Sequence, residues 1–335
     1  MDLTVIIPTR DRREILFETL AMLEPQLGAG GFEAIVVDDG SRDGTQEAVR
    51  RLADSARFPL RLIEQDGRGP AAGRNRGLAA ARAPVCLFID DDKFPAPDLL
   101  VRHRDFHGRR PEPEVAMLGY VGVASTPPPT PFMRWLADLH FDFAGIEDDQ
   151  NAGGDHFFSG NVSVKTAFAR DAGGFDERFP SPAHEDIDLG LRLEKRGMRL
   201  VYDRRAVVDH CHPTDLPGAI DRYYRAGPSL AYFVERYPGF PVARRPDARH
   251  RVKAAALTVL AALGVRTPRV RRETWRFLCH EAAREGFWDA VDGRFGGGDG
   301  LRIGGTLARL ASRDPAACMP PRVEPAARKL ETAIA

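Results

Sequence analysis

The sequence predicts an α/β fold, in which a Rossmann-like, mostly parallel central sheet is flanked by helices and followed by a helical C-terminal extension. Short apolar runs alternate with helical patterns over residues 1–122, and several of these runs end in polar clusters. From Asp215 onward the pattern is helical. Strands that alternate with helices form βαβ units, whose right-handed crossovers bring the carboxyl ends of the strands to one edge of the sheet.

The elements of the alternating part follow from its apolar runs. Val85–Ile89 is apolar at every position, which is typical of a parallel strand buried on both faces. The other strands are expected near 3–7, 33–37, 60–63 and 115–121, with helices near 11–24, 45–56, 70–81 and 97–107.

The rest of the chain begins with a proline-rich stretch, Thr126 to Pro131, which cannot form a central strand or a helix. It predicts a loop that leads into a mobile segment near 145–154, after which residues 156–212 return to the sheet. Within the extension, the tyrosines and arginines of 222–225 favour packing on the preceding domain over contact with lipid. Helices are expected near 217–236, 249–264, 271–291 and 301–312, and the tail after 315 is expected to be loosely held.

Asp90, Asp91 and Asp92 directly follow the buried strand 85–89. Open α/β sheets bind ligands outside the carboxyl ends of their strands, so these carboxylates are expected at a ligand-binding edge. Three adjacent carboxylates repel one another unless a cation or sugar hydroxyls share their charge. The alternative is a solvated acidic turn that caps the next helix.

Two further strand ends carry polar residues, since one apolar run stops at Asp38-Asp39 and the first stops at Pro8-Thr9-Arg10. The glycine-rich phosphate loops of dinucleotide-binding and Walker-type proteins are absent from the sequence. A nucleotide would therefore have to be held by carboxylates, hydroxyls, arginine and a metal.

Several stretches of the chain resemble the family 2 glycosyltransferases, which have the GT-A fold. Their order and spacing agree with the family over roughly residues 1–235. The stretches are TVIIPTRDR (4–12), VVDDGSRDGT (36–45), GPAAGRNRGL (69–78), FIDDDKFP (88–95), FSGNVSVK (158–165), GGFDERF (173–179), HEDIDLGLRLEKRG (184–197) and AVVDH (206–210). The resemblance implies a nucleotide-sugar-binding half at 1–122, an acceptor-binding half of the same domain at 123–214 and a helical extension at 215–335.

The resemblance also implies an inverting transfer of a sugar from a nucleotide-diphosphate sugar, with a UDP-sugar favoured, to an acceptor hydroxyl. Asp39 would accept hydrogen bonds from the base, Asp90 and Asp92 form the DxD motif, and Asp91 is expected to face the ribose. For Asp38 the alternative is to cap the following turn, and for Arg74 it is a surface position on a helix. Lys93 departs from the family pattern and would touch a phosphate or only reduce repulsion. The nucleotide-sugar-binding residues implied are Pro8, Thr9, Arg10, Asp39, Arg74, Asp90 and Asp91.

The metal implied is manganese (Mn2+) or magnesium (Mg2+), which suits hard oxygen ligands. Asp92 is the first choice of ligand, and His210 is the second, with His212 as a nearby competitor. A nitrogen ligand would favour manganese. The alternative for His210 is a structural role at a strand end.

Asp186 is the candidate catalytic base, because the acceptor hydroxyl is a poor nucleophile until its proton is taken. It belongs to the Glu185-Asp186 pair, which resembles the family's ED motif; the alternative is that both are only acidic charges at a helix start. Gly160 would let the backbone approach the sugar, and Asn161 would hydrogen-bond a donor or acceptor hydroxyl. Glu185 is included with them as a sugar- or acceptor-binding residue.

Composition excludes some classes of function. Lys plus Arg and Asp plus Glu number 48 each, so no bulk attraction to nucleic acid is expected. The four cysteines have no CxxC spacing, the first residues enter a strand with no signal segment, and the longest apolar stretch, 254–265, is too short to span a bilayer. A cytoplasmic protein is expected, and peripheral contact with the inner membrane face is compatible with this.

Other classes fit the motifs less well. A sugar-phosphate nucleotidylyltransferase would need a glycine-rich basic loop after the first strand, where PTRDR stands. A catalytically inactive sugar-nucleotide-binding module would be favoured by loss of the base or metal ligands, yet Asp92, Asp186 and His210 are present. A metal-dependent hydrolase would be expected to carry an HExxH-type cluster.

Overall fold

The computed structural model describes residues 1–29, 31–240, 245, 247–296 and 305–320 of the chain. Its centre is one eight-stranded sheet in the order β3-β2-β1-β4-β7-β6-β8-β5. The strands are β1 (Leu3–Thr9), β2 (Phe32–Asp38), β3 (Leu60–Glu64), β4 (Val85–Ile89), β5 (Lys93–Pro95), β6 (Val115–Val123), β7 (Asn161–Lys165) and β8 (Arg199–His210). β3, β2, β1 and β4 are parallel, whereas β7 is antiparallel to both β4 and β6.

Side chains alternate between the two faces of this sheet, which explains why its inner strands are apolar throughout. In β4, Leu87 belongs to the core on one face and Phe88 to the core on the other. Val5 and Ile6 of β1 divide in the same way. The predicted buried parallel strands are therefore confirmed.

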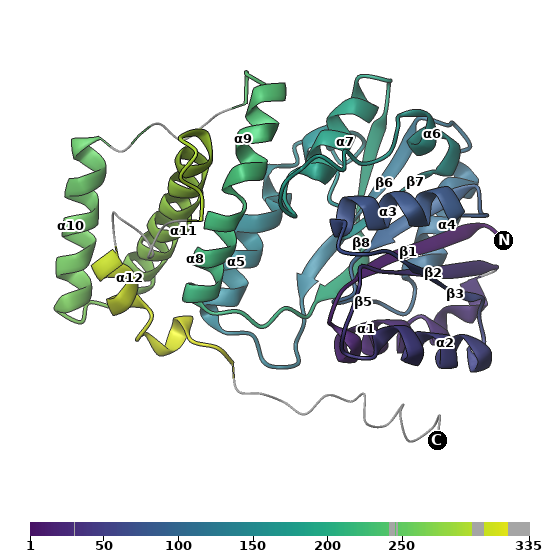
Figure 1. Ribbon diagram of the computed structural model, residues 1–335, viewed down its shortest axis with the longest axis horizontal. Coiled ribbons are helices and arrows are strands. Elements are labelled where there is room, and N and C mark those ends of the chain that lie inside the picture. The colour runs from purple at the N-terminus through teal and green to yellow at the C-terminus, as the bar shows by residue number, and fades with distance from the viewer. Residues whose placement is uncertain (30, 241–244, 246, 297–304, 321–335) are drawn as a thin grey trace.

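Helices cover both faces of the sheet (Figure 1). Those of the first half are α1 (Arg13–Ala21), the short 3-10 helix η1 (Glu24–Ala29), α2 (Thr45–Ser55), α3 (Gly69–Ala80) and α4 (Leu99–Arg109). α3 lies unusually close to β1, since a Cβ atom added at Gly77 would stand 2.4 Å from Cγ2 of Ile6. This close packing holds α3 directly against β1.

The segment 145–154, expected to be mobile, is hydrogen-bonded along β8. The N–H of Ala152 donates to the carbonyl of Leu200, and the N–H of Tyr202 donates to the carbonyl of Asp149, both at 2.7 Å. The backbone pairing supplies order that the polar sequence did not indicate. The helices of this part are α5 (Pro131–Phe141), η2 (Phe143–Gly145), η3 (Gly154–His156), α6 (Thr166–Asp171) and α7 (Glu185–Glu194).

The extension is helical, as predicted, and has a core of its own. Its helices are α8 (Leu216–Arg225), α9 (Gly227–Arg236), α10 (Ala248–Ala262), α11 (Pro268–Val291), α12 (Gly305–Ala311) and η4 (Pro315–Ala317). Trp275 of α11 packs against Phe132 and Trp135 of α5, so α5 joins the extension to the sheet. In Figure 1, α10 and α12 lie at the end of the molecule farthest from the sheet, and α5 and α8 lie between.

The single helix expected over 217–236 is two helices that break at Gly227. A Cβ atom at Gly227 would lie 2.1 Å from the carbonyl carbon of Gly286 in α11, so the break lies where the two backbones touch. Tyr223 packs on the helical core and Tyr224 donates to Asp289 at 3.0 Å, so the tyrosines of 222–225 pack inside the protein. The expectations for 301–304 and for the tail from 321 lie outside the described residues.

Candidate active site

The polar ends of β1, β2 and β4 meet at one edge of the sheet. The Oγ1 atom of Thr9 donates to Oδ2 of Asp91 at 2.8 Å. The N–H of Asp39 donates to the carbonyl of Thr9 at 2.9 Å. The βαβ topology has therefore brought together the three polar strand ends that stand far apart in the sequence.

Two cations lie against Asp91 and Asp92. Arg12 contacts both, at 2.9 Å from Oδ1 of Asp91 and 2.7 Å from Oδ2 of Asp92. The Nζ atom of Lys93 lies 2.6 Å from Oδ1 of Asp92. The repulsion expected within the triplet is thus relieved by protein cations. Arg12 was not among the predicted site residues, although its place three residues after the first strand could have suggested it.

The neighbouring carboxylates differ in their pKa values. Burial raises the pKa of Asp91 to about 7, against the opposing effect of Arg12. Burial also disfavours the charged form of Asp92, but Lys93 and the histidines beside it hold the pKa of Asp92 well below its ordinary value. Asp92 is therefore firmly ionised at neutral pH, as a metal ligand must be.

Asp92, His210 and His212 form a cluster in which one potential ligand atom from each residue lies within 4.8 Å of the others. The Nε2 atom of His210 is 3.4 Å, and the Nδ1 atom of His212 is 3.5 Å, from Oδ2 of Asp92. Burial and then Lys93 lower the pKa of His210 to about 4, so its ring is neutral at pH 7 and keeps a nitrogen lone pair. One carboxylate and two imidazoles fit a divalent transition metal such as manganese better than magnesium.

Arg74 joins the acidic triplet to the start of α7. Its guanidinium lies 2.8 Å from Oδ1 of Asp90 and 2.9 Å from Oε1 of Glu185. Arg74 and Glu185 are both buried, so the surface alternative for Arg74 is wrong. Burial raises the pKa of Glu185 to about 7, although Arg74 favours its charged form. Glu185 is committed to this ion pair through one of its two oxygens.

Asp186 stands beside Glu185 in the first turn of α7 but has a different environment. Its Oδ2 atom accepts from the N–H of Ser159 at 3.2 Å, and its Oδ1 atom accepts from the N–H of Ile187 at 2.9 Å. Neither partner is a cation. Asp186 is half-buried, whereas Glu185 is buried. The structure therefore leaves Asp186 the more accessible carboxylate of the pair.

Gly160 lies against the triplet, because a Cβ atom there would be 3.0 Å from Cε of Lys93 and 3.4 Å from Oδ2 of Asp90. The position of Gly160 beside the triplet is thus established, and its approach to a sugar stays a prediction. Asn161 is different. Its fully buried amide donates to the carbonyls of Tyr120 and Ala206, at 3.0 and 2.9 Å. The prediction that Asn161 binds a sugar hydroxyl is wrong in this structure, because the side chain ties strands together inside the sheet.

Asp39 shapes the loop before α3. Its carboxylate accepts from the N–H groups of Arg68 and Gly69, at 2.7 and 2.9 Å, and from Nε2 of Gln65 at 2.8 Å. The Nη1 atom of Arg10 lies 3.7 Å from the same carboxylate.

Asp38 caps the turn that follows β2. Its Oδ2 atom accepts from the N–H groups of Gly40 and Ser41, at 3.2 and 3.0 Å. This is the structural alternative considered for it. Pro8 precedes the end of β1 and lies near Gly73 of α3, where an added Cβ atom would be 3.3 Å from the Pro8 Cβ atom.

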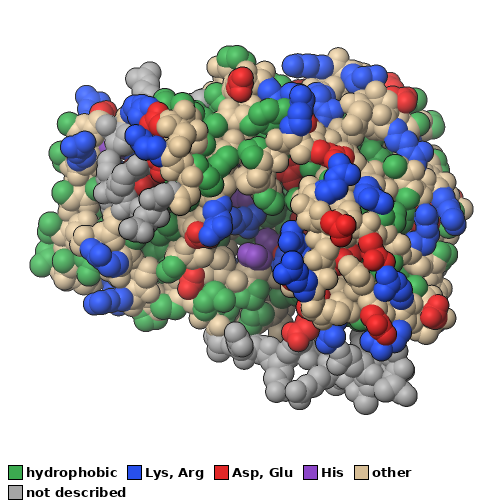
Figure 2. Space-filling model, viewed as in Figure 1, with side chains coloured by type: hydrophobic (Ala, Val, Ile, Leu, Met, Phe, Trp, Pro, Cys, Tyr) green, Lys and Arg blue, Asp and Glu red, His purple; other side chains and the backbone are tan. Residues whose placement is uncertain are grey.

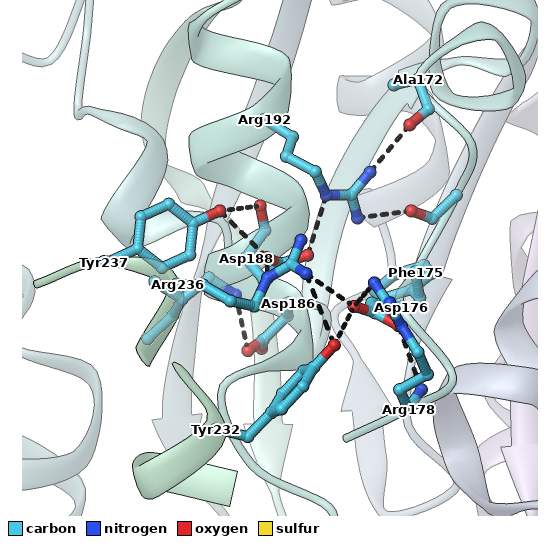
Figure 3. Close-up of polar contacts among 12 residues, drawn as sticks. Ala172, Phe175, Asp176, Arg178, Asp186, Asp188, Arg192, Tyr232, Arg236 and Tyr237 are labelled. Atoms are coloured by element: carbon cyan, nitrogen blue, oxygen red, sulfur yellow. Dashed lines mark hydrogen bonds and ion pairs between the residues drawn. The ribbon is translucent and has the colours of Figure 1, made fainter. Parts of the chain in front are cut away.

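A polar network that the sequence did not predict ties α7 to α9 (Figure 3). The buried carboxylate of Asp188 accepts from Nε of Arg192 at 2.8 Å, from Nε of Arg236 at 3.2 Å and from the hydroxyl of Tyr237 at 2.9 Å. Figure 3 also labels Asp186, which lies in the same first turn of α7 as Asp188. The extension therefore holds the helix that carries Glu185 and Asp186.

The space-filling view shows a hollow near the middle of this face, with histidine side chains inside it and Lys or Arg side chains at its sides (Figure 2). The geometry described above combines a strand-end carboxylate cluster, two histidines and an accessible carboxylate at a helix start. Such a set can hold a diphosphate and a divalent cation and can accept a proton.

Comparison with known proteins agrees with this chemistry. Residues 4–125 match the family described as Glycosyl transferase family 2. The chain therefore contains a domain of glycosyltransferase family 2. Validoxylamine A glucosyltransferase from Streptomyces hygroscopicus subsp. jinggangensis is 31% identical over 265 residues, which cover 68% of this chain and 61% of that relative. This chain therefore spans about three fifths of that relative's length.

Two solved structures share the fold. The mannosyltransferase PcManGT from Pyrobaculum calidifontis, in complex with GDP-Man and Mn2+, has a TM-score of 0.59 at 22% identity and covers 86% of this chain and 87% of its own. S. aureus TarS 1-349 in complex with UDP has a TM-score of 0.51 at 18% identity and covers 90% and 97%. The predicted GT-A fold is confirmed. None of the described helices is both long enough and apolar enough to cross a bilayer.

Proposed function

We propose that the protein is an inverting, metal-dependent glycosyltransferase that moves a sugar from a nucleotide-diphosphate sugar to an acceptor hydroxyl. The observation that carries the proposal is the cluster of Asp92, His210 and His212 at the edge where the polar strand ends meet. Its donor set suits a divalent cation, and the neighbouring Arg12 and Lys93 suit the phosphates that such a cation would accompany.

The donor would lie along the ends of β1, β2 and β4. Thr9, Arg10 and the loop that Asp39 holds border the space for the base and ribose. Arg74 holds the carboxylate of Asp90 in place, because its guanidinium forms ion pairs with both Asp90 and Glu185. A UDP-sugar is the first candidate donor and GDP-mannose the second, because two structures with this fold are complexes with UDP and with GDP-Man.

Asp92, His210 and His212 would hold the metal, with manganese favoured by the two nitrogen ligands. When bound, the cation would offset the negative charge that grows on the leaving diphosphate. Lys93 now contacts Asp92, and its flexible side chain can turn toward a phosphate oxygen instead.

Asp186 would take the proton of the acceptor hydroxyl as that oxygen attacks the anomeric carbon. Its half-buried carboxylate is bound only by neutral N–H and O–H donors, so a substrate hydroxyl can replace one of them. Glu185 is the competing base, but it is buried and forms an ion pair with Arg74, so its role is structural. Direct attack opposite the diphosphate inverts the anomeric centre.

The test is a panel of UDP-, GDP-, dTDP- and CDP-sugars, each with manganese, with magnesium and with neither. Binding to the native state raises the melting temperature by mass action, and release of nucleoside diphosphate reports transfer or hydrolysis. We expect one nucleotide-sugar to raise the Tm only when a divalent cation is present. If no member of the panel changes the Tm or releases diphosphate, the proposal is wrong.

Asp92→Ala should abolish this cation-dependent rise in Tm. The Tm of the free protein should also fall, because Arg12 and the buried Lys93 lose a partner. Asp54→Ala, on the exposed face of α2, is the matched control. Donor affinity that is unchanged in Asp92→Ala with manganese present would contradict the assignment of the metal site.

A further inference from the structure

The outer face of α10 is apolar although it points away from the rest of the protein. Val252, Val259 and Leu263 are 69%, 57% and 73% exposed. Together with the exposed Ala256 they follow the spacing i, i+4, i+7, i+11, which places all four on one face of a helix. Ala254 and Leu257, on the opposite face, are the residues that pack into the helical core. The exposed stripe formed by Val252, Ala256, Val259 and Leu263 therefore takes no part in the packing of α10 on the helical core.

Cations border this stripe on both sides. At about 100° per residue, Arg249 and Lys253 project on one side of it and Arg251 on the other. Arg266 and Arg269 continue the basic surface beyond the C-terminal end of α10. The chain from 248 to 272 contains no Asp or Glu, although Lys and Arg balance Asp and Glu in the protein as a whole. This stretch of the chain is therefore basic, although the protein as a whole carries no net charge.

Most of these cations are not used inside the protein. Lys253 pairs with Glu273 at 3.1 Å. Arg249, Arg251, Arg266 and Arg269 are exposed, and none has an ion pair with a carboxylate of the described residues. Long basic side chains beside an apolar stripe can bury their methylene groups while their charges reach lipid headgroups. We propose that α10 binds the surface of an anionic lipid bilayer, with its apolar stripe in the headgroup boundary and its arginines on the phosphates.

The charge pattern favours lipid over the other surfaces that could cover an apolar face. In a pair formed by two copies of α10, the basic borders of one copy would face those of the other, with no carboxylate from 248–272 to compensate. Nucleic acid would use the arginines but would leave the apolar stripe in water. An anionic bilayer satisfies both features, since interfacial helices combine a basic face with an apolar one.

The position of α10 suits such contact. It lies at the end of the molecule, with α11 and α8 between it and the sheet that carries the candidate active site (Figure 1). Binding through this face would hold the protein at a bilayer without covering the site. The apolar side chains are few and small, so the attraction should depend strongly on charge and weaken as salt shortens the Debye length.

The experiment is vesicle flotation of the full chain with phosphatidylcholine alone and with phosphatidylcholine mixed with phosphatidylglycerol. We expect binding to the anionic vesicles only, which falls as ionic strength rises from about 0.01 to about 1 M. Arg249→Glu combined with Arg251→Glu should reduce binding on the order of tenfold or more. Val259→Ser combined with Leu263→Ser should also reduce it, because these changes remove apolar area without changing the charge.

Arg196→Glu combined with Arg199→Glu is the matched control, because it changes the net charge equally at exposed positions far along the sequence from α10. Circular dichroism of each variant checks that the fold is retained. Equal binding of the α10 variants and the control would overturn the proposal, as would equal binding of the wild type to neutral vesicles. Sedimentation that shows a dimer lost in Val259→Ser with Leu263→Ser, without vesicle binding, would assign the face to a second copy instead.

Discussion

Glu185 and Asp186 show how adjacent carboxylates acquire different chemistry. Both lie in the first turn of α7, where the helix dipole favours negative charge. Their side chains leave the helix in different directions, so Glu185 meets the buried guanidinium of Arg74 and Asp186 meets the neutral donors of Ser159. One carboxylate is thereby used to build the site, and the other remains available to a substrate.

Asp186→Asn is expected to lower turnover about 10²–10⁴-fold and to leave donor affinity unchanged, because asparagine keeps the shape and cannot take a proton. Glu185→Gln is expected to lower the Tm instead, since it leaves the buried Arg74 with less compensation. Steady-state kinetics, donor titration and thermal unfolding of both variants check this. Greater loss of turnover in Glu185→Gln, at unchanged stability, would mean that Glu185 is the base.

Asp39→Ala is expected to weaken nucleotide binding and to lower stability by about 1.5–3 kcal/mol, the range for hydrogen bonds to a charged group. The reason is that its carboxylate holds the N–H groups of Arg68 and Gly69 at the entrance to α3. Asp66→Ala, at an exposed position of the same loop, is the control. Calorimetric titration with UDP and GDP measures nucleotide affinity, and thermal unfolding measures stability. If Asp39→Ala binds the nucleotide as tightly as the wild type, Asp39 has no role in nucleotide binding.

At the scale of elements, the helical extension does more than follow the catalytic domain in the sequence. α9 supplies Arg236 to the buried Asp188 of α7, and Tyr237 directly after α9 contacts the same carboxylate. α5 enters the aromatic core of the extension. The helix that carries the candidate base is therefore held by α9 through Arg236 and by α3 through Arg74. This explains physically why α7 can keep several carboxylates at its start: the cations that compensate them come from three separate elements.

Arg236→Ala is expected to destabilise the protein by about 1–3 kcal/mol, less than the loss of a fully buried pair because Arg192 still compensates Asp188. Arg178→Ala is the control, since Arg178 pairs with Asp176 but its side chain is 71% exposed, where ion pairs add little to stability. Chemical denaturation of the two variants gives the comparison. Equal losses would show that the Asp188 network does not anchor α7.

At the scale of the whole molecule, acid should unfold the protein through histidines that the fold keeps neutral. Burial lowers the pKa of His103 to about 4 and that of His107 to about 2, and both hydrogen-bond to Ser163. In the unfolded chain each would titrate near 6.5. The unfolded state therefore binds more protons below pH 6.5, and stability falls as pH decreases from there toward the folded pKa values.

The expected contribution of His103 between pH 6.5 and 4 is about 3 kcal/mol, from roughly 1.4 kcal/mol for each unit of pKa difference. His103→Gln should be less stable at pH 7.5 but should lose stability less steeply on acidification, by up to one proton in the linkage slope. Denaturant unfolding at a series of pH values measures that slope. A slope equal to that of the wild type would show that His103 is not one of the groups that acid protonates.

The sequence by itself determined the order of the elements and the edge at which the chemistry lies. Apolar runs such as Val85–Ile89 predict strands covered on both faces. The βαβ connections then bring the strand ends that precede Asp39 and Asp90 to one edge of the sheet. The resemblance to family motifs singled out Asp92, Asp186 and His210 as candidate functional residues. These are properties of local pattern and connectivity, which a sequence expresses directly.

Only the tertiary structure decided which partner each polar side chain has. Arg74 is buried between Asp90 and Glu185, Asn161 is enclosed in the sheet, and His212 joins Asp92 beside His210. The break at Gly227 has the same origin, because it depends on contact with Gly286 in another helix. Such pairings join residues far apart in the chain, and their energy depends on distance and burial, which no local pattern contains.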